Sequence, residues 1–330
     1  MTAVRAQTDK LQTDKLQTGK LQTGKPQTGK LVLYTSQPDK DAAQTAAEFR
    51  KLNPGIQMEI FRSGTTEVMS KLAAEIAAGQ PKADVLLIAD AVSMEALKRD
   101  GHLLAYMEAN LDGFRDGAFD RDRTYFGSKL ITTGIAYNTA ATLKPESWAD
   151  LTQPALKGQV TMPSPLYSGA AAIMLGTMSQ RTDLGWAYFE ALKAADAQAV
   201  RGNGAVLKSV ASGEKAYGVL VDFMALTAKA KGSPIEFVFP REGVPAVTEP
   251  VAILKTSANP AAAKAFVDFI LSDAGQRLAA SQGYVPAKTG IPNPSWLPEG
   301  TMINLMPIDT AAILKATEAD KKRFAALFGG

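Results

Sequence analysis

The chain has 330 residues, a net charge of +3, and the composition of an ordinary globular protein, with 46% hydrophobic and 21% charged residues. Its basic and acidic residues are interspersed and no basic run contains aromatic residues, which argues against nucleic-acid binding. The absence of Cys excludes disulfides, thiolate metal sites and thiol catalysis. No apolar run approaches the length of a membrane span, so we expect a protein that is not embedded in a membrane.

A five-residue repeat occupies residues 7–30, where each Gln is followed by Thr, by Asp or Gly, and by Lys. A period of five matches neither a helix nor a strand, and the few Leu residues cannot bury a face. Two Gly-x-x-x-x-Gly-Lys matches inside the repeat lack the following Ser or Thr and the preceding strand of a phosphate-binding loop. We therefore predict that residues 1–30 are a disordered tail.

Strands and helices alternate after the tail. The sequence predicts strands at residues 31–34, 56–60 and 84–88, with helices at 39–52 and from Ser63 onward. Such alternation is typical of a doubly wound α/β lobe, in which ligands bind at the carboxyl ends of the strands.

The same alternation starts again after a strand-like stretch near residues 130–137. The further elements are predicted as strands at 158–162 and 217–221 and helices at 168–179, 183–194, 205–212 and 260–271. We expect a second lobe inserted into the first. The predicted boundaries are 31–133 and 250–330 for lobe 1, and 134–249 for lobe 2.

Several short motifs in this order resemble the periplasmic solute-binding proteins of the ferric-iron, phosphonate and polyamine group. Each motif is weak alone, but together they cover nearly all of residues 31–290. They are Leu33-Tyr34-Thr35-Ser36, Ser63-Gly64-Thr65-Thr66-Glu67, Ala83-Asp84-Val85 to Asp90, Thr133 to Thr139, Ser164 to Gly169, Ser212-Gly213-Glu214 with Tyr217-Gly218, and Ala265 to Ser272 with Gly275-Gln276.

The resemblance implies a type II periplasmic binding protein fold, with two α/β lobes joined by two crossing hinge segments near residues 130–137 and 244–252. It also implies the substrate-binding component of an ABC importer that carries no catalytic residues and no cofactor. The expected partners are a small solute and an inner-membrane permease, and we expect a monomer. The periplasmic location rests on the resemblance, since residues 1–30 contain no visible signal peptide.

Two predicted helix starts are candidates for binding an anion. Ser63, Gly64, Thr65 and Thr66 precede or begin one helix, and the segment 167–169 does the same in the second lobe. Free N–H groups and the helix dipole favour an anion there, although simple capping of the helix explains the same residues. From the second lobe, the candidates are Tyr167, Ser168 and Gly169.

Four further candidates lie at strand ends. Ser36 and Asp90 follow the first and third strands, Tyr217 begins a strand of the second lobe, and Asp222 directly follows that strand. The Asp222 carboxylate could pair with a cationic group of the ligand, and helix capping is the alternative for both Asp residues. An aromatic residue next to a strand, such as Tyr217, more often belongs to the core than to a binding site.

Iron and enzymatic chemistry are disfavoured by the residues themselves. In ferric-binding members of the family, adjacent tyrosines and an early histidine bind the metal, but the corresponding positions here appear as Phe223, Met224 and Pro38. His102 is the only histidine, which leaves no Ser-His-Asp set, and no Gly-x-Ser-x-Gly elbow is present. We expect no metal. An enzyme on the same fold remains the alternative from a different class.

The candidate residues favour a small anionic or zwitterionic solute, with an aminoalkylphosphonate as the preferred example. Two helix starts would hold the anionic group, and Asp222 with Asp90 would face an amine. A sugar phosphate, an amino acid, a polyamine and ferric iron stay open as alternatives.

Overall fold

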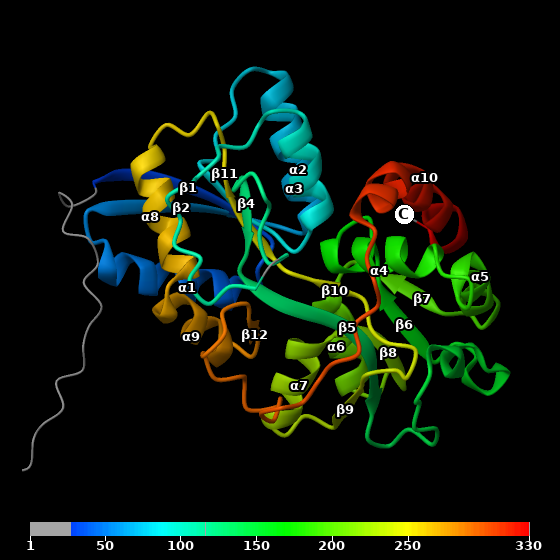
Figure 1. The fold of residues 1–330 in the computed structure, drawn as a ribbon. Coiled ribbons are helices and arrows are strands. Elements are labelled where there is room, and N and C mark those ends of the chain that lie inside the picture. The colour runs from blue at the N-terminus through cyan, green and yellow to red at the C-terminus, as the bar shows by residue number, and fades with distance from the viewer. Residues whose placement is uncertain (1–27, 116, 330) are drawn as a thin grey trace, which may run out of the picture.

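The computed structural model describes residues 28–115 and 117–329, which form two α/β lobes side by side (Figure 1). The predicted tail falls almost entirely on residues 1–27, which lie outside the described residues. The first strand begins at Gly29, so the last two residues of the predicted tail, 29 and 30, belong to the first sheet.

The first lobe is built on a five-stranded sheet with the order β2-β1-β3-β11-β4. The first three strands run parallel, and β11 returns antiparallel to β3. Its strands are β1 Gly29–Thr35, β2 Ile56–Arg62, β3 Val85–Leu87, β4 Tyr125–Gly127 and β11 Pro250–Ile253. Its helices are α1 Asp39–Leu52, α2 Thr65–Ala77, α3 Ala91–Arg99, α8 Pro260–Leu271 and α9 Asp273–Ser281.

Apolar stripes hold these helices on the sheet. Phe49 of α1 and Phe266 of α8 are fully buried, and their rings meet edge to face at 5.2 Å between centroids. Local residues set the ends of these helices. Helix α1 ends just before Asn53 and Gly55, and α8 begins at Pro260 with Asn259 as its N-cap.

The second lobe has a seven-stranded sheet, with the order β10-β5-β8-β6-β7 and with β9 and β12 also paired to β5. The strands are β5 Lys129–Asn138, β6 Val160–Pro163, β7 Gln198–Val200, β8 Tyr217–Val221, β9 Ile235–Val238, β10 Ala246–Val247 and β12 Val285–Pro286. The helices are α4 Gly169–Ser179, α5 Gly185–Ala194, α6 Asn203–Ala211 and α7 Asp222–Ala230, with short 3₁₀ turns at Trp148–Thr152 and Pro154–Leu156.

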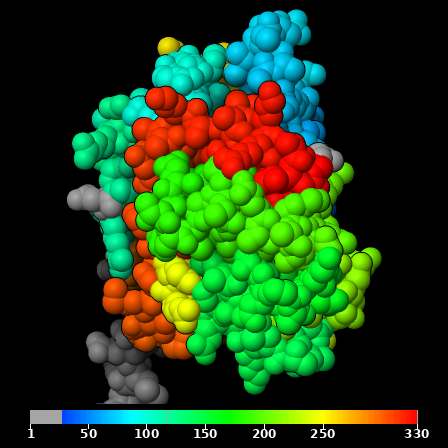
Figure 2. All heavy atoms as spheres, turned by 90° about the vertical axis from the view of Figure 1, so that its right-hand side faces the viewer, coloured from blue at the N-terminus to red at the C-terminus, as the bar shows by residue number. Residues whose placement is uncertain are grey.

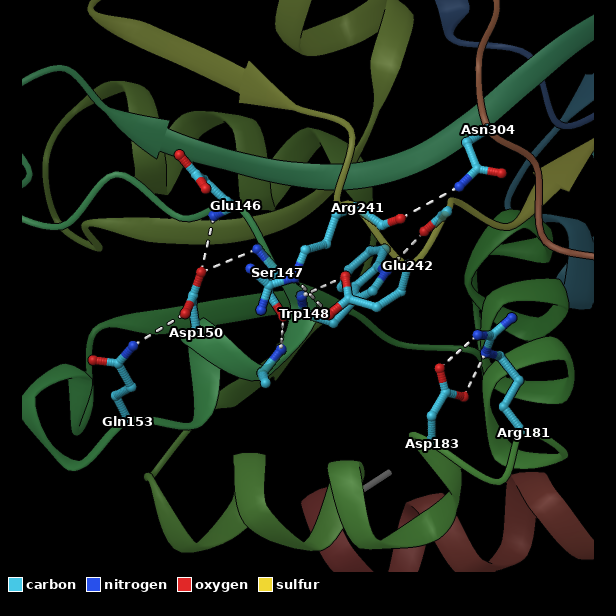
Figure 3. Close-up of polar contacts among 12 residues, drawn as sticks. Glu146, Ser147, Trp148, Asp150, Gln153, Arg181, Asp183, Arg241, Glu242 and Asn304 are labelled. Atoms are coloured by element: carbon cyan, nitrogen blue, oxygen red, sulfur yellow. Dashed lines mark hydrogen bonds and ion pairs between the residues drawn. The ribbon is translucent and has the colours of Figure 1, made fainter.

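Trp148 is fully buried in the core of this lobe, and Figure 3 shows the polar contacts around it. Its indole N–H donates to the carbonyl oxygen of Gly243 at 2.9 Å, and Ser147 caps the 3₁₀ turn. The Glu242 carboxylate accepts hydrogen bonds from Ser147 and from the Trp148 backbone. These bonds fix residues 242–243 just before the chain returns to the first lobe.

The chain crosses between the sheets twice, once just before the stretch 130–137 that was predicted as a hinge and once within the predicted stretch 244–252. The first crossing is at Ser128, between β4 and β5, and the second is at Thr248 and Glu249, between β10 and β11. The two crossings are bonded to each other, because the Ser128 N–H donates to the Thr248 carbonyl at 3.0 Å and its hydroxyl donates to the Glu249 carbonyl at 2.7 Å.

The C-terminal helix α10, Thr310–Phe328, contacts both lobes. It packs on α4 and α5 and also on α3, and in Figure 2 it lies along the boundary between the green second lobe and the cyan part of the first. Phe324 is fully buried in the core of the second lobe. Because α10 contacts both lobes, it cannot be assigned to one of them by its contacts alone. The lobe boundaries given above remain a prediction.

Most predicted elements are confirmed in place. The helices at Asp39–Leu52 and Pro260–Leu271 and the strand at Tyr217–Val221 have the predicted bounds. The helix predicted to start at Ser63 instead has Gly64 as its N-cap. Among the described residues, no helix is both long enough and apolar enough to cross a membrane.

Candidate functional site

A cleft of about 380 Å³ lies between the two lobes. It is lined by side chains and backbone from the strand ends and helix starts of both sheets. The lining residues used below are Ser36, Pro38, Asp39, Arg62, Gly64, Thr65, Tyr167, Ser168, Gly169, Ala170, Arg201, Gly202, Asn203, Gly204, Phe223, Met224, Glu249 and Tyr284. Six of the residues predicted from the sequence are among them: Ser36, Gly64, Thr65, Tyr167, Ser168 and Gly169.

Helix α2 begins at the cleft without a side-chain cap, since Gly64 is its N-cap. A Cβ on Gly64 would lie 2.6 Å from the Tyr167 ring, so this close approach between the lobes requires glycine. The Thr66 N–H donates to the Tyr167 carbonyl at 3.4 Å. The start of α2 therefore contacts the second lobe directly.

Helix α4 begins opposite, with the Ser168 hydroxyl accepting from the Ala171 N–H at 3.3 Å. The Asn203 amide donates to the same hydroxyl at 3.1 Å and so ties α4 to the start of α6. A Cβ on Gly169 would lie 2.5 Å from the Ala89 carbonyl oxygen, which belongs to the first lobe.

Helix α6 supplies a third N-terminus to the same cleft. Its N-cap is Gly202, which has no side chain to accept from the first turn, and Asn203 and Gly204 line the cleft beside it. The first N–H groups of a helix have no partner within the helix and carry the positive end of its dipole. The starts of α2 and α6 have no side-chain cap, whereas α4 is capped by Ser168, and the positive dipole ends of all three helices make this part of the cleft attractive to an anion.

Two arginines add positive charge. The Arg201 guanidinium lies 2.9 Å from the Glu67 carboxylate across the lobes and 4.6 Å from the centre of the Tyr167 ring. Arg62 donates from Nε to the Gln37 carbonyl at 2.7 Å and lies 3.3 Å from Asp39. A guanidinium can bind phosphate or carboxylate oxygens with two parallel hydrogen bonds.

The cleft floor carries charge of the opposite sign. Glu249 lines the cleft and forms a buried ion pair with Lys129, with 2.5 Å between Oε2 and Nζ. The Lys129 ammonium also lies 3.8 Å from the centre of the Tyr284 ring. The Tyr284 hydroxyl donates to Asp41 at 2.7 Å. Burial raises the pKa of Glu249, and the neighbouring Lys129 opposes that rise.

The remaining predicted residues do not line the cleft. The Ser63 hydroxyl donates to Glu67, and the Thr66 hydroxyl donates to the Pro165 carbonyl at 3.4 Å. Asp90 caps α3 by accepting from the Ser93 N–H at 3.0 Å, and burial raises its pKa. This placement matches the capping alternative for Asp90.

Tyr217 and Asp222 are buried within the second lobe. The Tyr217 hydroxyl is bonded to the backbone of Leu143, and its ring packs in the core. The Asp222 carboxylate accepts from the Thr132 N–H at 3.1 Å and from its hydroxyl at 2.7 Å. Burial raises the pKa of Asp222 to about 7. Asp222 therefore fastens α7 to the crossing strand β5.

Four charged lining residues were missed by the sequence reasoning: Asp39, Arg62, Arg201 and Glu249. Arg201 directly precedes Gly202-Asn203-Gly204, a sequence typical of a turn before a helix. That turn was the local signal from which a cleft position of Arg201 could have been predicted. Arg62 lies two residues beyond the predicted strand 56–60 and is the last residue of β2 in the structure. Glu249 had no local signal, because its position depends on where the second crossing meets the first.

The three residues that the resemblance was expected to place at iron-ligand positions also line the cleft. Phe223, Met224 and Pro38 are all in its wall, and none offers a hard oxygen donor. Within residues 28–115 and 117–329, no group of three or more His, Cys, Asp or Glu side chains is placed to hold a metal ion.

Comparisons with known proteins find a matching family and similar proteins. The family described as bacterial extracellular solute-binding protein matches residues 80–310. A putrescine/cadaverine-binding protein from Pseudomonas aeruginosa is 32% identical over 266 residues, covering 72% of each chain. An uncharacterized protein from Haemophilus influenzae is 28% identical over 270 residues, which cover 77% of this chain and 76% of that one.

Solved structures share the fold. The periplasmic binding protein AfuA from Actinobacillus pleuropneumoniae, with fructose-6-phosphate bound, has a TM-score of 0.83 and 24% identity, over 92% of this chain and 99% of that one. Iron-bound HitA from Pseudomonas aeruginosa has a TM-score of 0.79 and 21% identity, over 89% and 99%. The chain thus has the fold of type II periplasmic binding proteins.

Proposed function

The chain belongs to the bacterial extracellular solute-binding protein family, and from that premise we propose that it captures a small anionic or zwitterionic solute in the interlobe cleft for import. Members of this family bind solutes for transport, so the protein is a binding protein and not an enzyme. In the proposed role it works in the periplasm and hands its solute to an ABC permease in the inner membrane.

The observation that carries the anionic specificity is the convergence of three helix N-termini on one cleft. The starts of α2 and α6 have no side-chain cap, and α4 begins between them at Ser168. Arg201 lies at the same place with its guanidinium held against Tyr167. A phosphonate or phosphate group has enough acceptor oxygens to bind several of these donors at once.

The favoured solute is an aminoalkylphosphonate or a molecule of the same charge pattern. Its anionic group would lie at the three helix starts, and its amine would face the carboxylates that line the cleft. Those carboxylates are Asp39 and Glu249, which take the role that the sequence suggested for Asp222 and Asp90. A cavity of about 380 Å³ suits a ligand of this size.

A polyamine is the second candidate, because the 32% identical relative is named for putrescine and cadaverine. A diamine could use both carboxylates, but it would make no use of the positive charge of Arg62 and Arg201 that lines the cleft. A sugar phosphate, as bound in the AfuA structure, would use the helix starts and make no use of the two carboxylates. Ferric iron is the least supported, since Phe223, Met224 and Pro38 cannot bind it.

A thermal-shift and calorimetric screen tests the proposal. The probes are 2-aminoethylphosphonate, ethylphosphonate, fructose-6-phosphate, putrescine and ferric citrate. We expect the phosphonates to raise the melting temperature, because a ligand that binds only the folded state stabilises it by mass action. Arg201→Gln should abolish most of that shift. Stabilisation by putrescine alone, unchanged in Arg201→Gln, would replace the anionic proposal with a polyamine one.

A further inference from the structure

The ring of Tyr167 lies between the starts of two helices that belong to different lobes. One edge of the ring faces Gly64, the N-cap of α2, and the opposite edge faces Gly202, the N-cap of α6. A Cβ on Gly64 would lie 2.6 Å from the ring, and a Cβ on Gly202 would lie 2.9 Å from it. Both positions therefore leave room for the ring because they are glycine.

The position of this ring is fixed through its face and through its backbone. The Arg201 guanidinium lies over the ring, 4.6 Å from its centre, and Arg201 also pairs with Glu67 of the first lobe. The Tyr167 N–H donates to the Ser164 carbonyl at 3.1 Å, and the Tyr167 carbonyl accepts from the Thr66 N–H at 3.4 Å. A tyrosine side chain has few rotatable bonds, so these contacts hold the ring as a rigid body.

The ring takes up part of the space between the two helix starts that have no side-chain cap. Tyr167 and both glycines line the cleft, with Arg201 beside them. A solute group at these helix starts therefore has a rigid aromatic wall next to it. Because protein interiors are close-packed, a group that is too large must displace this wall or lose its contact with the helix N–H groups.

We propose that Tyr167 limits the size of the anionic group, so that the cleft takes a terminal phosphonate or a phosphate monoester and rejects the corresponding esters and diesters. This assignment rests on the proposed function and specifies its solute class. A terminal phosphonate or phosphate group offers three acceptor oxygens to the surrounding donors. An ester carries a carbon on one of these oxygens, and that carbon must lie against a donor or against the Tyr167 ring. One extra methylene in a close-fitting pocket changes discrimination by about 10- to 200-fold.

A series of variants at residue 167 tests this assignment with a matched pair of ligands. Calorimetry is run with 2-aminoethylphosphonate and with its monomethyl ester on the parent, Tyr167→Phe, Tyr167→Leu and Tyr167→Ala. The parent should bind the unmodified compound at least about tenfold more tightly than the ester. Tyr167→Phe keeps the ring and should keep this ratio within about twofold. The ratio should fall in Tyr167→Leu and fall further in Tyr167→Ala, because each substitution opens more space beside the helix starts.

The ratio of the two affinities separates the size of the site from a general loss of binding. The ester also carries less negative charge, but Arg201 and the helix starts are the same in every variant, so this difference is common to all of them. Tyr167→Ala removes a contact between the lobes and should weaken both ligands, and a loss shared by both leaves their ratio unchanged. The melting temperature of each variant without ligand shows that it is folded.

The outcomes distinguish a failure of this assignment from a failure of the proposed function. If the parent binds both compounds equally, or if Tyr167→Ala keeps the ratio of the parent, the anion site stands and the assignment of Tyr167 is overturned. A ratio that falls as far in Tyr167→Phe as in Tyr167→Ala would assign the preference to the hydroxyl, and it also overturns the size limit. If the parent binds putrescine and neither phosphonate, the anionic specificity fails and the assignment fails with it.

Discussion

Arg201 of the second lobe and Glu67 of the first form an ion pair across the cleft, with 2.9 Å between the guanidinium and the carboxylate. Both side chains are substantially exposed, at 70% and 46%, so the pair itself contributes at most about 1 kcal/mol. It matters chiefly because Arg201 also lines the cleft and can exchange Glu67 for a ligand anion.

Replacing Glu67 and replacing Arg201 should therefore have different effects on the affinity for an anionic solute. Glu67→Gln should change the affinity for an anionic solute by less than about fivefold, because only an exposed ion pair is lost. Arg201→Gln should weaken binding by about tenfold or more, because a charge-assisted hydrogen bond to the ligand is lost. Calorimetry at two salt concentrations measures both, and equal losses would restrict Arg201 to holding the lobes together.

Asp222 should make the stability of the protein depend on pH. Its pKa is raised from 3.8 to about 7 by burial, so the folded protein keeps a proton that the unfolded chain releases between these values. Binding more protons in the folded state means that the free energy of unfolding falls as pH rises through this window. Asp222→Asn keeps an acceptor for Thr132 and removes the charge.

The Asn variant should therefore show a smaller fall in melting temperature between about pH 4 and pH 7 than the parent. Both proteins share the contributions of the other buried acids, so the difference between their curves isolates Asp222. Parallel curves would contradict the raised pKa. The affinity of the same variant decides whether Asp222 also acts on the ligand.

Closure depends on the absence of a side chain at residue 169. A Cβ there would lie 2.5 Å from the Ala89 carbonyl oxygen and 2.6 Å from the Thr65 hydroxyl, both in the other lobe. Gly169→Ala should keep the lobes apart, so small-angle scattering with ligand should show less compaction than in the parent. Gly204→Ala is the control, because its Cβ would have no heavy atom within 4 Å. Full compaction of Gly169→Ala would mean that the lobes close along another path.

Phe324 anchors the C-terminal helix. Its ring is fully buried and meets the rings of Phe189 and Phe328 at 6.5 and 4.8 Å. Phe324→Ala should cost about 3–5 kcal/mol in the free energy of unfolding, measured with denaturant. Phe328→Ala, at the partly buried end of the helix, should cost less. If both variants lose only a small and equal amount of unfolding free energy, the buried ring of Phe324 does not anchor α10.

Local signals predicted most elements but few of the charged residues at the cleft. Helix α1 ends where Asn53, Pro54 and Gly55 stop it, and these signals are visible within a few residues. Gly64 and Ser168 were found because helix starts after strands point to a cleft. In contrast, Thr132, which donates two hydrogen bonds to the Asp222 carboxylate, lies 90 residues away in sequence, so this arrangement could not be predicted from the residues next to Asp222.

Glu249 illustrates the same limit most clearly. Its role depends on Lys129 in the other crossing, on the ring of Tyr284 and on a backbone angle that no residue pattern encodes. Sequence patterns describe periodicity within one element, whereas this site arises where two crossings and a third segment meet.

The position of α10 has a kinetic consequence. The helix is fixed to the second lobe by Phe324 and by the contact of Ile313 with Gly176, where a Cβ would lie only 2.6 Å from the Ile313 side chain. It also packs on α3 of the first lobe, and it contributes no residue to the described lining of the cleft. Opening the lobes must separate α3 from α10 as well as release the solute. We therefore expect the lifetime of the bound state to depend in part on the surface between α3 and α10, which lies outside the described lining of the cleft.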